Sequence, residues 1–238
     1  MERKNTMSEL GNDNKIKWVE DRDSTFPIFC KNHNHVIYQL NENTLLKVFQ
    51  PHVSQEQQQK LAIVTQYFLN HGSSKDFIPT CAWLSDQGFF CYEMKYDVNY
   101  RPLSQVLPRF DSTQIEEVLH VIEKELLEHT SEYIYTDIDV DNILYFDGKI
   151  KWIDFDDCLI TNKLSEAERK MGINHQRSVF NLFSISLLYR VSLEDIYYLE
   201  QSQHLSDQQK EKIREMLSAH HLTLDSLLEH YHVLNRQK

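Results

Sequence analysis

Carboxylates gather in one short stretch of the chain, which reads YIYTDIDVDNILYFDGKIKWIDFDDC over residues 133–158. The side chains in it that could bind a cation or move a proton are Asp137, Asp139, Asp141, Asn142, Asp154 and Asp156. Oxygen atoms of this kind bind hard divalent cations or act in proton transfer. An EF-hand calcium loop is excluded, because its sixth position holds Asn142 instead of glycine and its twelfth holds Gly148 instead of glutamate. The alternative is a set of solvated turn residues, since aspartate is common in loops.

A β-hairpin should bring two of these side chains together. Asp147-Gly148 is a strong two-residue turn signal, so the flanking residues should pair outward from it until Asn142 lies opposite Ile153. Asn142 and Asp154 then become diagonal neighbours, about 5 to 8 Å apart, at the open end of the ribbon. Two oxygen ligands at that separation can share one cation, whereas without a cation water must screen them. Magnesium keeps several waters and binds substrate phosphates, so a metal-phosphate site is the sharper hypothesis.

The rest of the chain must position this hairpin, and its pattern changes near Tyr96. The first part is predicted to contain an antiparallel hairpin at 35–49, a helix from Ser54 to Gly72 and two short strands within 78–96. The second part is predicted to be helical at 112–129, 175–189 and 206–234. The predicted organisation is a polar, disordered tail at 1–16, a nucleotide-binding lobe at 17–96 and a catalytic lobe at 97–238.

Composition bounds the class of protein. With 238 residues, of which 41% are apolar, the chain can bury a core. Its formal charge of -11, from 25 basic and 36 acidic residues, disfavours a nucleic-acid partner. Four cysteines without a CxxC spacing indicate a reduced, cytoplasmic protein, and no apolar run approaches the length of a membrane span.

TDIDVDNIL followed by IDFD resembles the catalytic and metal-binding segments of the protein-kinase-like superfamily. That superfamily includes protein kinases, aminoglycoside and choline kinases, and bacterial lipopolysaccharide kinases. The resemblance implies an α+β fold of two lobes, with a small antiparallel β N-lobe carrying one helix and a mostly helical C-lobe. It also implies that Asp137 orients or deprotonates the attacking hydroxyl, while Asn142 and Asp154 hold Mg²⁺ on the phosphates of ATP. Asp156, two residues after Asp154, completes the predicted metal-ligand set.

The first lobe agrees with this resemblance in outline. Lys47, within LLKVF, stands where the superfamily places the strand lysine that pairs with the nucleotide phosphates, and Asp154 is its expected partner. FFCYEMKY resembles the strand that leads into the hinge between the lobes. The residues whose backbone groups would then face adenine are Glu93, Met94, Lys95 and Tyr96.

The sequence also departs from the pattern. No glycine lies between Gly11 and Gly72, so a glycine-rich phosphate loop is absent, and the equivalent stretch reads CKNHNHVIY. Asparagine and histidine can donate hydrogen bonds, so His33, Asn34 and His35 are candidates to replace the loop at the phosphates.

Two further positions of the pattern are altered. In the helix that should carry a glutamate opposite Lys47, Glu56 is the only acid and Gln57 lies on the apolar stripe, so a glutamine could hydrogen-bond the lysine instead. The histidine expected before the catalytic aspartate is replaced, and Tyr135 is expected to fill its place in the core.

Two functions follow from these observations. The first is an ATP- and Mg²⁺-dependent phosphotransferase that acts on a hydroxyl of a protein or of a small molecule such as a sugar. The second is a pseudokinase-like module that binds a protein partner and is weakly active or inactive.

Overall fold

The computed structural model describes residues 27–31, 35–49, 54–71, 79–84 and 90–223. The predicted tail at 1–16 and the candidate residues His33 and Asn34 lie outside these ranges. The chain divides into two compact units, each described by itself below. The first is Met1–Leu103 with Asn142–Cys158, and the second is Ser104–Asp141 with Leu159–Lys238. The lobe boundary predicted near Tyr96 stays a prediction.

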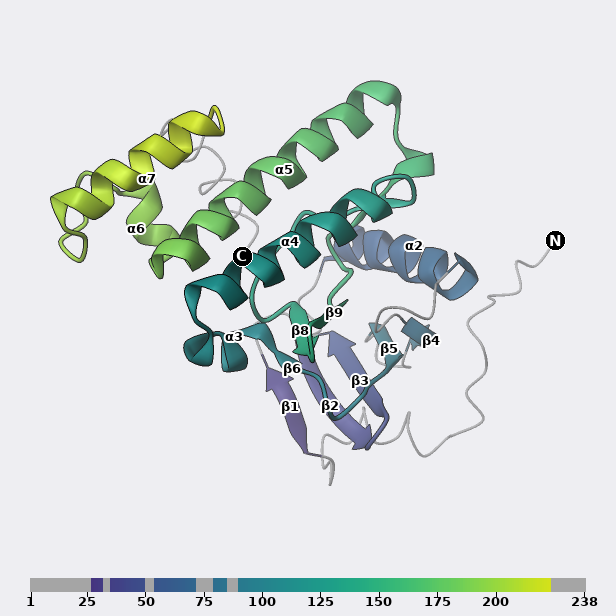
Figure 1. The fold of residues 1–238 in the computed structure, drawn as a ribbon. Helices are drawn as coiled ribbons and strands as arrows, with labels where there is room; N and C mark the ends of the chain where they lie inside the picture. Colours follow the sequence, from purple (N-terminus) through teal and green to yellow (C-terminus); the bar gives the residue numbers. More distant parts are fainter. Residues whose placement is uncertain (1–26, 32–34, 50–53, 72–78, 85–89, 224–238) are drawn as a thin grey trace. The chain divides into compact units, whose positions relative to one another are not determined.

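A five-stranded antiparallel sheet forms the centre of the first unit, with the strand order β1-β2-β3-β5-β4 (Figure 1). Its strands are β1 (Ile28–Lys31), β2 (His35–Asn41), β3 (Thr44–Phe49), β4 (Pro79–Leu84) and β5 (Phe90–Lys95). The hairpin predicted at 35–49 is confirmed as the pair β2 and β3, and the two strands predicted within 78–96 are β4 and β5. Every residue of β3 after Thr44 is buried, as expected for a central strand covered on both faces.

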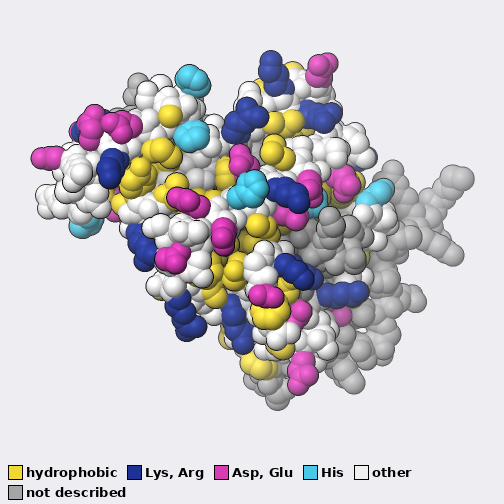
Figure 2. All heavy atoms as spheres, in the orientation of Figure 1, with side chains coloured by type: hydrophobic (Ala, Val, Ile, Leu, Met, Phe, Trp, Pro, Cys, Tyr) yellow, Lys and Arg dark blue, Asp and Glu magenta, His cyan; other side chains and the backbone are white. Residues whose placement is uncertain are grey.

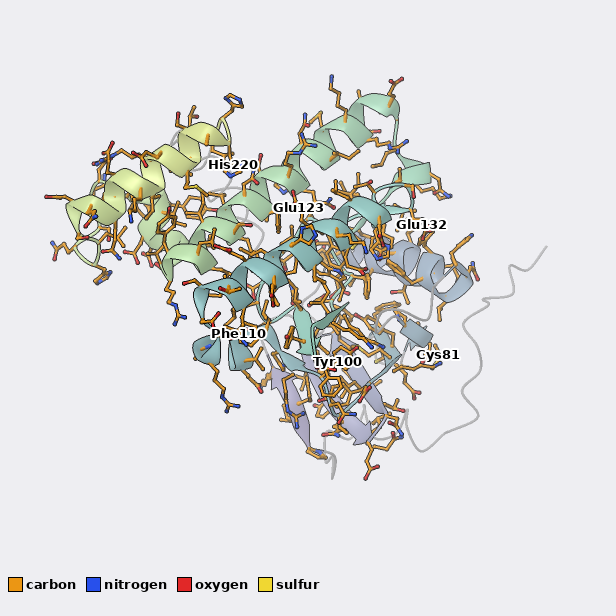
Figure 3. The ribbon with its side chains drawn as sticks, in the orientation of Figure 1. Cys81, Tyr100, Phe110, Glu123, Glu132 and His220 are labelled. Carbon is orange, nitrogen blue, oxygen red and sulfur yellow. The ribbon has the colours of Figure 1, made fainter. Side chains whose placement is uncertain are left out.

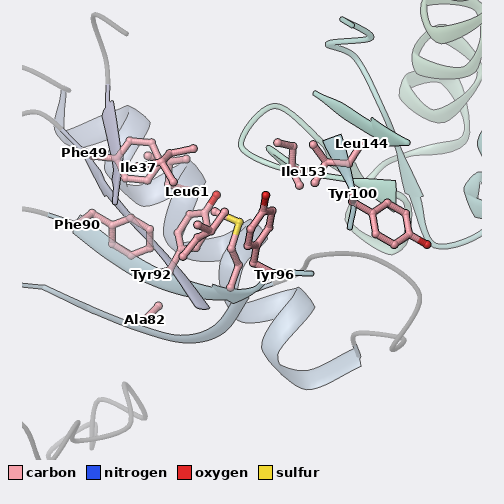
Figure 4. Close-up of a cluster of buried hydrophobic side chains, with 12 residues drawn as sticks. Ile37, Phe49, Leu61, Ala82, Phe90, Tyr92, Tyr96, Tyr100, Leu144 and Ile153 are labelled. Atoms are coloured by element: carbon pink, nitrogen blue, oxygen red, sulfur yellow. The ribbon is translucent and has the colours of Figure 1, made fainter. Parts of the chain in front are cut away.

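Helix α2 (Gln55–His71) packs against β4, and its predicted apolar stripe is confirmed. Leu61, Val64 and Phe68 recur at helical spacing and are all buried. The helix begins where Ser54 Oγ accepts a hydrogen bond from the Gln57 backbone N–H, the expected role of a serine cap. Aromatic and aliphatic side chains from the sheet, α2 and the later hairpin form one core cluster in this unit (Figure 4).

The predicted hairpin is confirmed as β8 (Ile143–Phe146) and β9 (Lys149–Trp152), which form a three-stranded sheet with β6 (Arg101–Pro102). Asp147 and Gly148 have φ values of 47° and 74°, the two positive values that a type I′ turn requires. Ile143 pairs with Trp152, and the Ile153 N–H donates to the Asn142 carbonyl over 3.0 Å, so the ribbon extends outward as predicted.

The second unit is mainly helical. Its elements are α3 (Leu103–Val106), η1 (Leu107–Arg109), α4 (Ser112–His129), β7 (Tyr133–Ile134), β10 (Leu159–Ile160), η2 (Thr161–Lys163), α5 (Glu166–Tyr189), α6 (Leu193–Tyr197) and α7 (Asp207–Ala219). The helix predicted at 112–129 is confirmed, and all five predicted core residues are buried along α4. Figure 3 labels Phe110, just before α4, whose carbonyl accepts a hydrogen bond from Arg190 after α5.

Two predicted helix boundaries in this unit were wrong. Helix α5 begins at Glu166 instead of 175, because Ser165 and Glu168 form a capping box there. Helix α7 ends at Ala219, so the helix predicted at 206–234 is interrupted there, and residues 224–234 lie outside the described ranges. The His221 N–H donates to the Ser218 carbonyl, and the Leu222 N–H donates to the Leu217 carbonyl over 2.9 Å. His221 is left-handed with a φ of 56°, so these bonds make a Schellman ending.

Candidate functional site

Lys47 is buried in the middle of the first unit. It lies on β3, in register with Ile37 of β2 and Tyr92 of β5, and its side chain is 0% exposed. Its Nζ lies 5.0 Å from the centre of the Phe49 ring and 5.8 Å from that of Tyr92. Since a buried ammonium is costly unless it is paired, its polar partners decide what this site is.

The partners are two aspartates at the end of the β8–β9 hairpin. Lys47 Nζ donates to Asp154 Oδ1 over 2.6 Å and also to Asp156 Oδ2. The two carboxylate side chains are 21% and 17% exposed, so the cluster reaches the protein surface on the aspartate side. The lysine–aspartate pairing expected from the sequence is therefore present.

The local backbone explains why both aspartates face the lysine. Asp154 has a φ of 67°, a left-handed conformation that aspartate tolerates better than most residues and that bends the chain after β9. Phe155 between the two aspartates is buried against Phe68 of α2, with ring centres 4.3 Å apart. Tyr92 of β5 donates its hydroxyl to Asp156 Oδ1 over 3.1 Å, so both oxygens of Asp156 are engaged.

The charges within this cluster shift one another's pKa values. Burial acts to lower the pKa of Lys47, but Asp154 and Asp156 outweigh it and raise the pKa. Burial acts to raise the pKa of Asp154, yet Lys47 holds it below its usual range. Burial and the neighbouring Asp154 raise the pKa of Asp156 well above its usual range. One negative charge therefore rests firmly on Asp154, and Asp156 is the carboxyl that keeps a proton more readily.

His35 lies beside the same aspartates. It is buried on β2, its ring contacts Phe49, and burial followed by the charge of Lys47 lowers its pKa to about 3. One ligand atom from each of His35, Asp154 and Asp156 lies within 4.8 Å of the others. The sequence predicted His35 as a phosphate donor and did not indicate that it joins the aspartates. Only the pairing of β2 with β3 and the position of the distant hairpin place it there.

The other residues of the predicted catalytic segment divide between the two units. Asn142, partly buried directly before β8, belongs to the same unit as Asp154. Asp137 is exposed and lies in the second unit, after β7. Tyr135 is buried as expected, and its backbone N–H donates to Gln176 Oε1 of α5 over 2.8 Å. The roles assigned to Asp137 and Asn142 stay predictions.

The predicted adenine-facing residues lie at the end of β5. Glu93, Met94 and Lys95 are within the strand, paired with β3, and Tyr96 follows directly. The Tyr96 N–H donates to the Asn43 carbonyl over 2.8 Å. That amide is therefore engaged by the turn between β2 and β3. Contact of the remaining backbone groups with adenine stays a prediction.

The glutamine suggested as a partner of Lys47 is directed elsewhere. Gln57 is exposed, and its Oε1 accepts a hydrogen bond from the Ser54 N–H over 3.0 Å, within the cap of α2. From the next turn of the helix, Lys60 forms an exposed ion pair with Asp157, with Nζ and Oδ1 2.8 Å apart. Capping therefore determines the direction of Gln57, and the sequence pattern SQEQ indicates such a cap.

Known structures resemble this arrangement of elements. The kinase domain of Mycobacterium tuberculosis PknI superposes with a TM-score of 0.52 over 71% of this chain and 76% of that one, at 13% identity. A single-substitution variant of it gives 0.53 over 69% and 72%, also at 13% identity. The chain has a protein-kinase-like fold. No family model and no curated protein matches the sequence, so the likeness lies in the fold.

The kinase-like fold confirms the predicted fold class, with its antiparallel sheet in one part and helices in the remainder. Across the described ranges, no helix combines the length and the apolar character needed to cross a bilayer.

Proposed function

We propose that the chain is an ATP- and Mg²⁺-dependent phosphotransferase that passes the γ-phosphoryl group to a hydroxyl of a protein or a small molecule such as a sugar. The observation that carries the proposal is the 2.6 Å bond between Lys47 Nζ and Asp154 Oδ1 within a kinase-like fold. Kinases need a strand lysine for the phosphates and a hairpin aspartate for the metal. Here the two groups lie side by side, with the aspartate still partly exposed.

The donor set fits the proposed metal. Asn142 and Asp154 offer amide and carboxylate oxygens, which are the ligands that Mg²⁺ prefers, and both would hold it. When bound, Mg²⁺ neutralises charge on the phosphate oxygens during transfer. Lys47 binds the same phosphates through its ammonium group. Because Asp154 and Asp156 outweigh the effect of burial and raise the pKa of Lys47, it stays charged at any physiological pH.

Asp137 is the proposed group that orients or deprotonates the attacking hydroxyl. Phosphoryl transfer depends mainly on positioning and charge neutralisation, so a few rigidly held groups supply most of the rate. The free cysteines Cys81, Cys91 and Cys158 fit the proposed cytoplasmic location, where thiols stay reduced.

Substitution of Asp137 tests the catalytic assignment. We expect Asp137→Asn to lower phosphate transfer by about 10²–10⁴-fold, the usual contribution of a general base. Asp141→Asn, an exposed neighbour that accepts a hydrogen bond from Ser104, is the matched control and should retain activity. ADP release against a panel of hydroxyl acceptors measures turnover, and circular dichroism checks that both variants are folded. Unchanged turnover in Asp137→Asn rejects the assignment.

A second candidate, a pseudokinase-like binding module, is favoured by one observation. Lys47 is already neutralised by two carboxylates, so a nucleotide phosphate must compete with them for the ammonium. A thermal shift with MgATP separates the two functions, because ligand at 100 times its dissociation constant stabilises the folded state by about 2.7 kcal/mol. Absence of any shift at millimolar nucleotide favours the binding module.

A further inference from the structure

Asp156 replaces a glycine of the kinase pattern. In protein kinases the metal-binding aspartate is followed by phenylalanine and glycine, whereas here Asp154-Phe155 is followed by a second aspartate. Asp156 Oδ2 accepts a hydrogen bond from Lys47 Nζ, and Oδ1 accepts one from the Tyr92 hydroxyl. An aspartate at this position therefore adds a side chain that reaches the strand lysine.

The carboxylate that kinases use for this contact comes from a helix instead. There the strand lysine is held by a glutamate of the N-lobe helix. In this chain the stripe position Gln57 bonds to Ser54 in the helix cap, and the acid nearest to it in sequence is Glu56. The carboxylates seen on Lys47 Nζ among the described side chains are those of Asp154 and Asp156.

We propose that Asp156 is the positioning residue for Lys47 and supplies the carboxylate that kinases take from the helix glutamate. Resting on the proposed function, this replaces the predicted metal-ligand role of Asp156 and leaves Mg²⁺ to Asn142 and Asp154. Tyr92 supports the arrangement, because its hydroxyl fixes the orientation of the carboxylate on the far side from the lysine.

Holding the ammonium from two sides gives it a defined position. Asp154 Oδ1 alone leaves the flexible lysine stem free to turn around one contact, whereas the second contact fixes Nζ between the two residues. If Asp154 holds Mg²⁺ on the nucleotide, Asp156 would still hold Lys47 in place beside the phosphates. Loss of Asp156 should therefore weaken nucleotide binding through Lys47 and leave the affinity for Mg²⁺ nearly unchanged.

The positioning can be tested without nucleotide. Brief acylation of the folded protein, read peptide by peptide in a mass spectrometer, reports how firmly each lysine amine is held. We expect Asp156→Asn to raise the labelling rate of Lys47 by about tenfold, the effect of losing one hydrogen bond to a charged group. Glu56→Gln, which removes the rival helix acid, should leave it unchanged.

Matched variants complete this first measurement. Asp157 lies one residue after Asp156 and pairs with the exposed Lys60. Asp157→Asn should therefore raise the labelling rate of Lys60 without changing that of Lys47. Tyr92→Phe keeps the ring but removes the hydroxyl, so it should raise the labelling rate of Lys47 by less than Asp156→Asn does. Labelling of Lys47 that stays at the wild-type rate in folded Asp156→Asn, or that rises in Glu56→Gln instead, overturns the inference.

Nucleotide binding tests whether the positioning of Lys47 by Asp156 matters for function. By calorimetry with MgADP, Asp156→Asn should weaken binding about tenfold in the wild-type background and have no further effect in Lys47→Met, because it acts through the lysine. The Mg²⁺ concentration at half-maximal turnover should not change. If that concentration rises severalfold, Asp156 is a metal ligand and the inference is wrong. If wild type neither binds MgADP nor turns over ATP, the proposed function fails, while Lys47 labelling still decides whether Asp156 holds the lysine.

Discussion

Among the residues that the structure describes, two clusters hold one cation between two carboxylates, and they differ in burial. In the first unit Lys47 is 0% exposed, and its partners Asp154 and Asp156 are 21% and 17% exposed. In the second unit Arg214 of α7 is 41% exposed between two glutamates. Their contact distances are similar, so the two clusters differ mainly in how far solvent water reaches the charged groups.

The surface cluster is the more regular of the two. Arg214 donates from Nε and Nη2 to both oxygens of Glu200, each over 2.9 Å, and Nη1 donates to Glu211. The glutamates are 53% and 62% exposed, and on the face shown in Figure 2 acidic and basic side chains are interspersed. Exposed pairs of this kind contribute little, because solvent screens them and their side chains lose freedom on pairing.

The comparison separates stability from function. A buried ion cluster can often be replaced by apolar residues with no loss of stability, so stability alone does not explain its presence. Lys47 lies among aromatic rings on a central strand, where a leucine or methionine would pack. A charge kept at such a position points to a ligand, which agrees with the proposed binding of nucleotide phosphates.

The largest expected effect is that of Lys47→Met. Removing the ammonium leaves two aspartates in the cluster without a counter-charge, so we expect the free energy of unfolding to fall by about 3–5 kcal/mol near neutral pH. Urea denaturation measures this. The loss should be smaller in acid, since the abandoned carboxyls can then take up protons. A loss under about 1 kcal/mol would show that this cluster contributes no more to stability than exposed ion pairs do.

The next effect concerns pH, and His35 and Asp156 should act in opposite directions. The pKa of His35 falls from 6.5 to about 3 on folding, so its contribution to stability is present above 6.5 and is lost as pH falls. The pKa of Asp156 is raised from 3.8, so its contribution is present below 3.8 and is lost as pH rises. Lys47 and Asp154 face both groups and keep their charges across this window.

Two variants separate these contributions. Relative to wild type, stability should fall more steeply with rising pH in His35→Gln and rise more steeply in Asp156→Asn. The His35→Gln difference should approach about 1.4 kcal/mol per pH unit between about pH 4 and 6, and the Asp156→Asn difference should have the opposite sign just above pH 3.8. Urea denaturation at several pH values gives both slopes. Slopes of the same sign would show that the two groups do not titrate as the buried cluster requires.

A smaller effect is expected for Arg214→Met, the surface counterpart of Lys47→Met. The free energy of unfolding should fall by about 0.2–1 kcal/mol, and the loss should shrink at high salt as the exposed charges are screened. Thermal or urea unfolding at low and high salt measures both. A loss as large as that of Lys47→Met would mean that geometry outweighs burial.

The smallest effect is expected for Asp157→Asn. Its pair with Lys60 is a single contact between side chains that are 56% and 48% exposed, so unfolding free energy should change by at most about 0.5 kcal/mol. Turnover should also be retained. A large loss of activity would extend the functional site beyond Asp156.

Much of the fold was predictable because its signals are local. The Asp147-Gly148 turn determines the register of β8 and β9, and the apolar spacing of α4 predicts both its ends and its buried face. The start of α5 had a local signal too, the serine and glutamate of SEAE, which periodicity alone overlooks. The short helix α6 escaped prediction, since five residues do not establish a period.

The sequence by itself determined the turns, the caps and the residues that can carry charge, because each depends on neighbours within a few positions. It also indicated Lys47 and Asp154 as partners through their resemblance to a known pattern. Only the tertiary structure decided that Asp156 and His35 join them, since Asp156 lies 109 residues from Lys47 in the chain and His35 lies on a neighbouring strand. Contacts at such separations depend on how sheet, helix and hairpin pack together, and no local spacing records that.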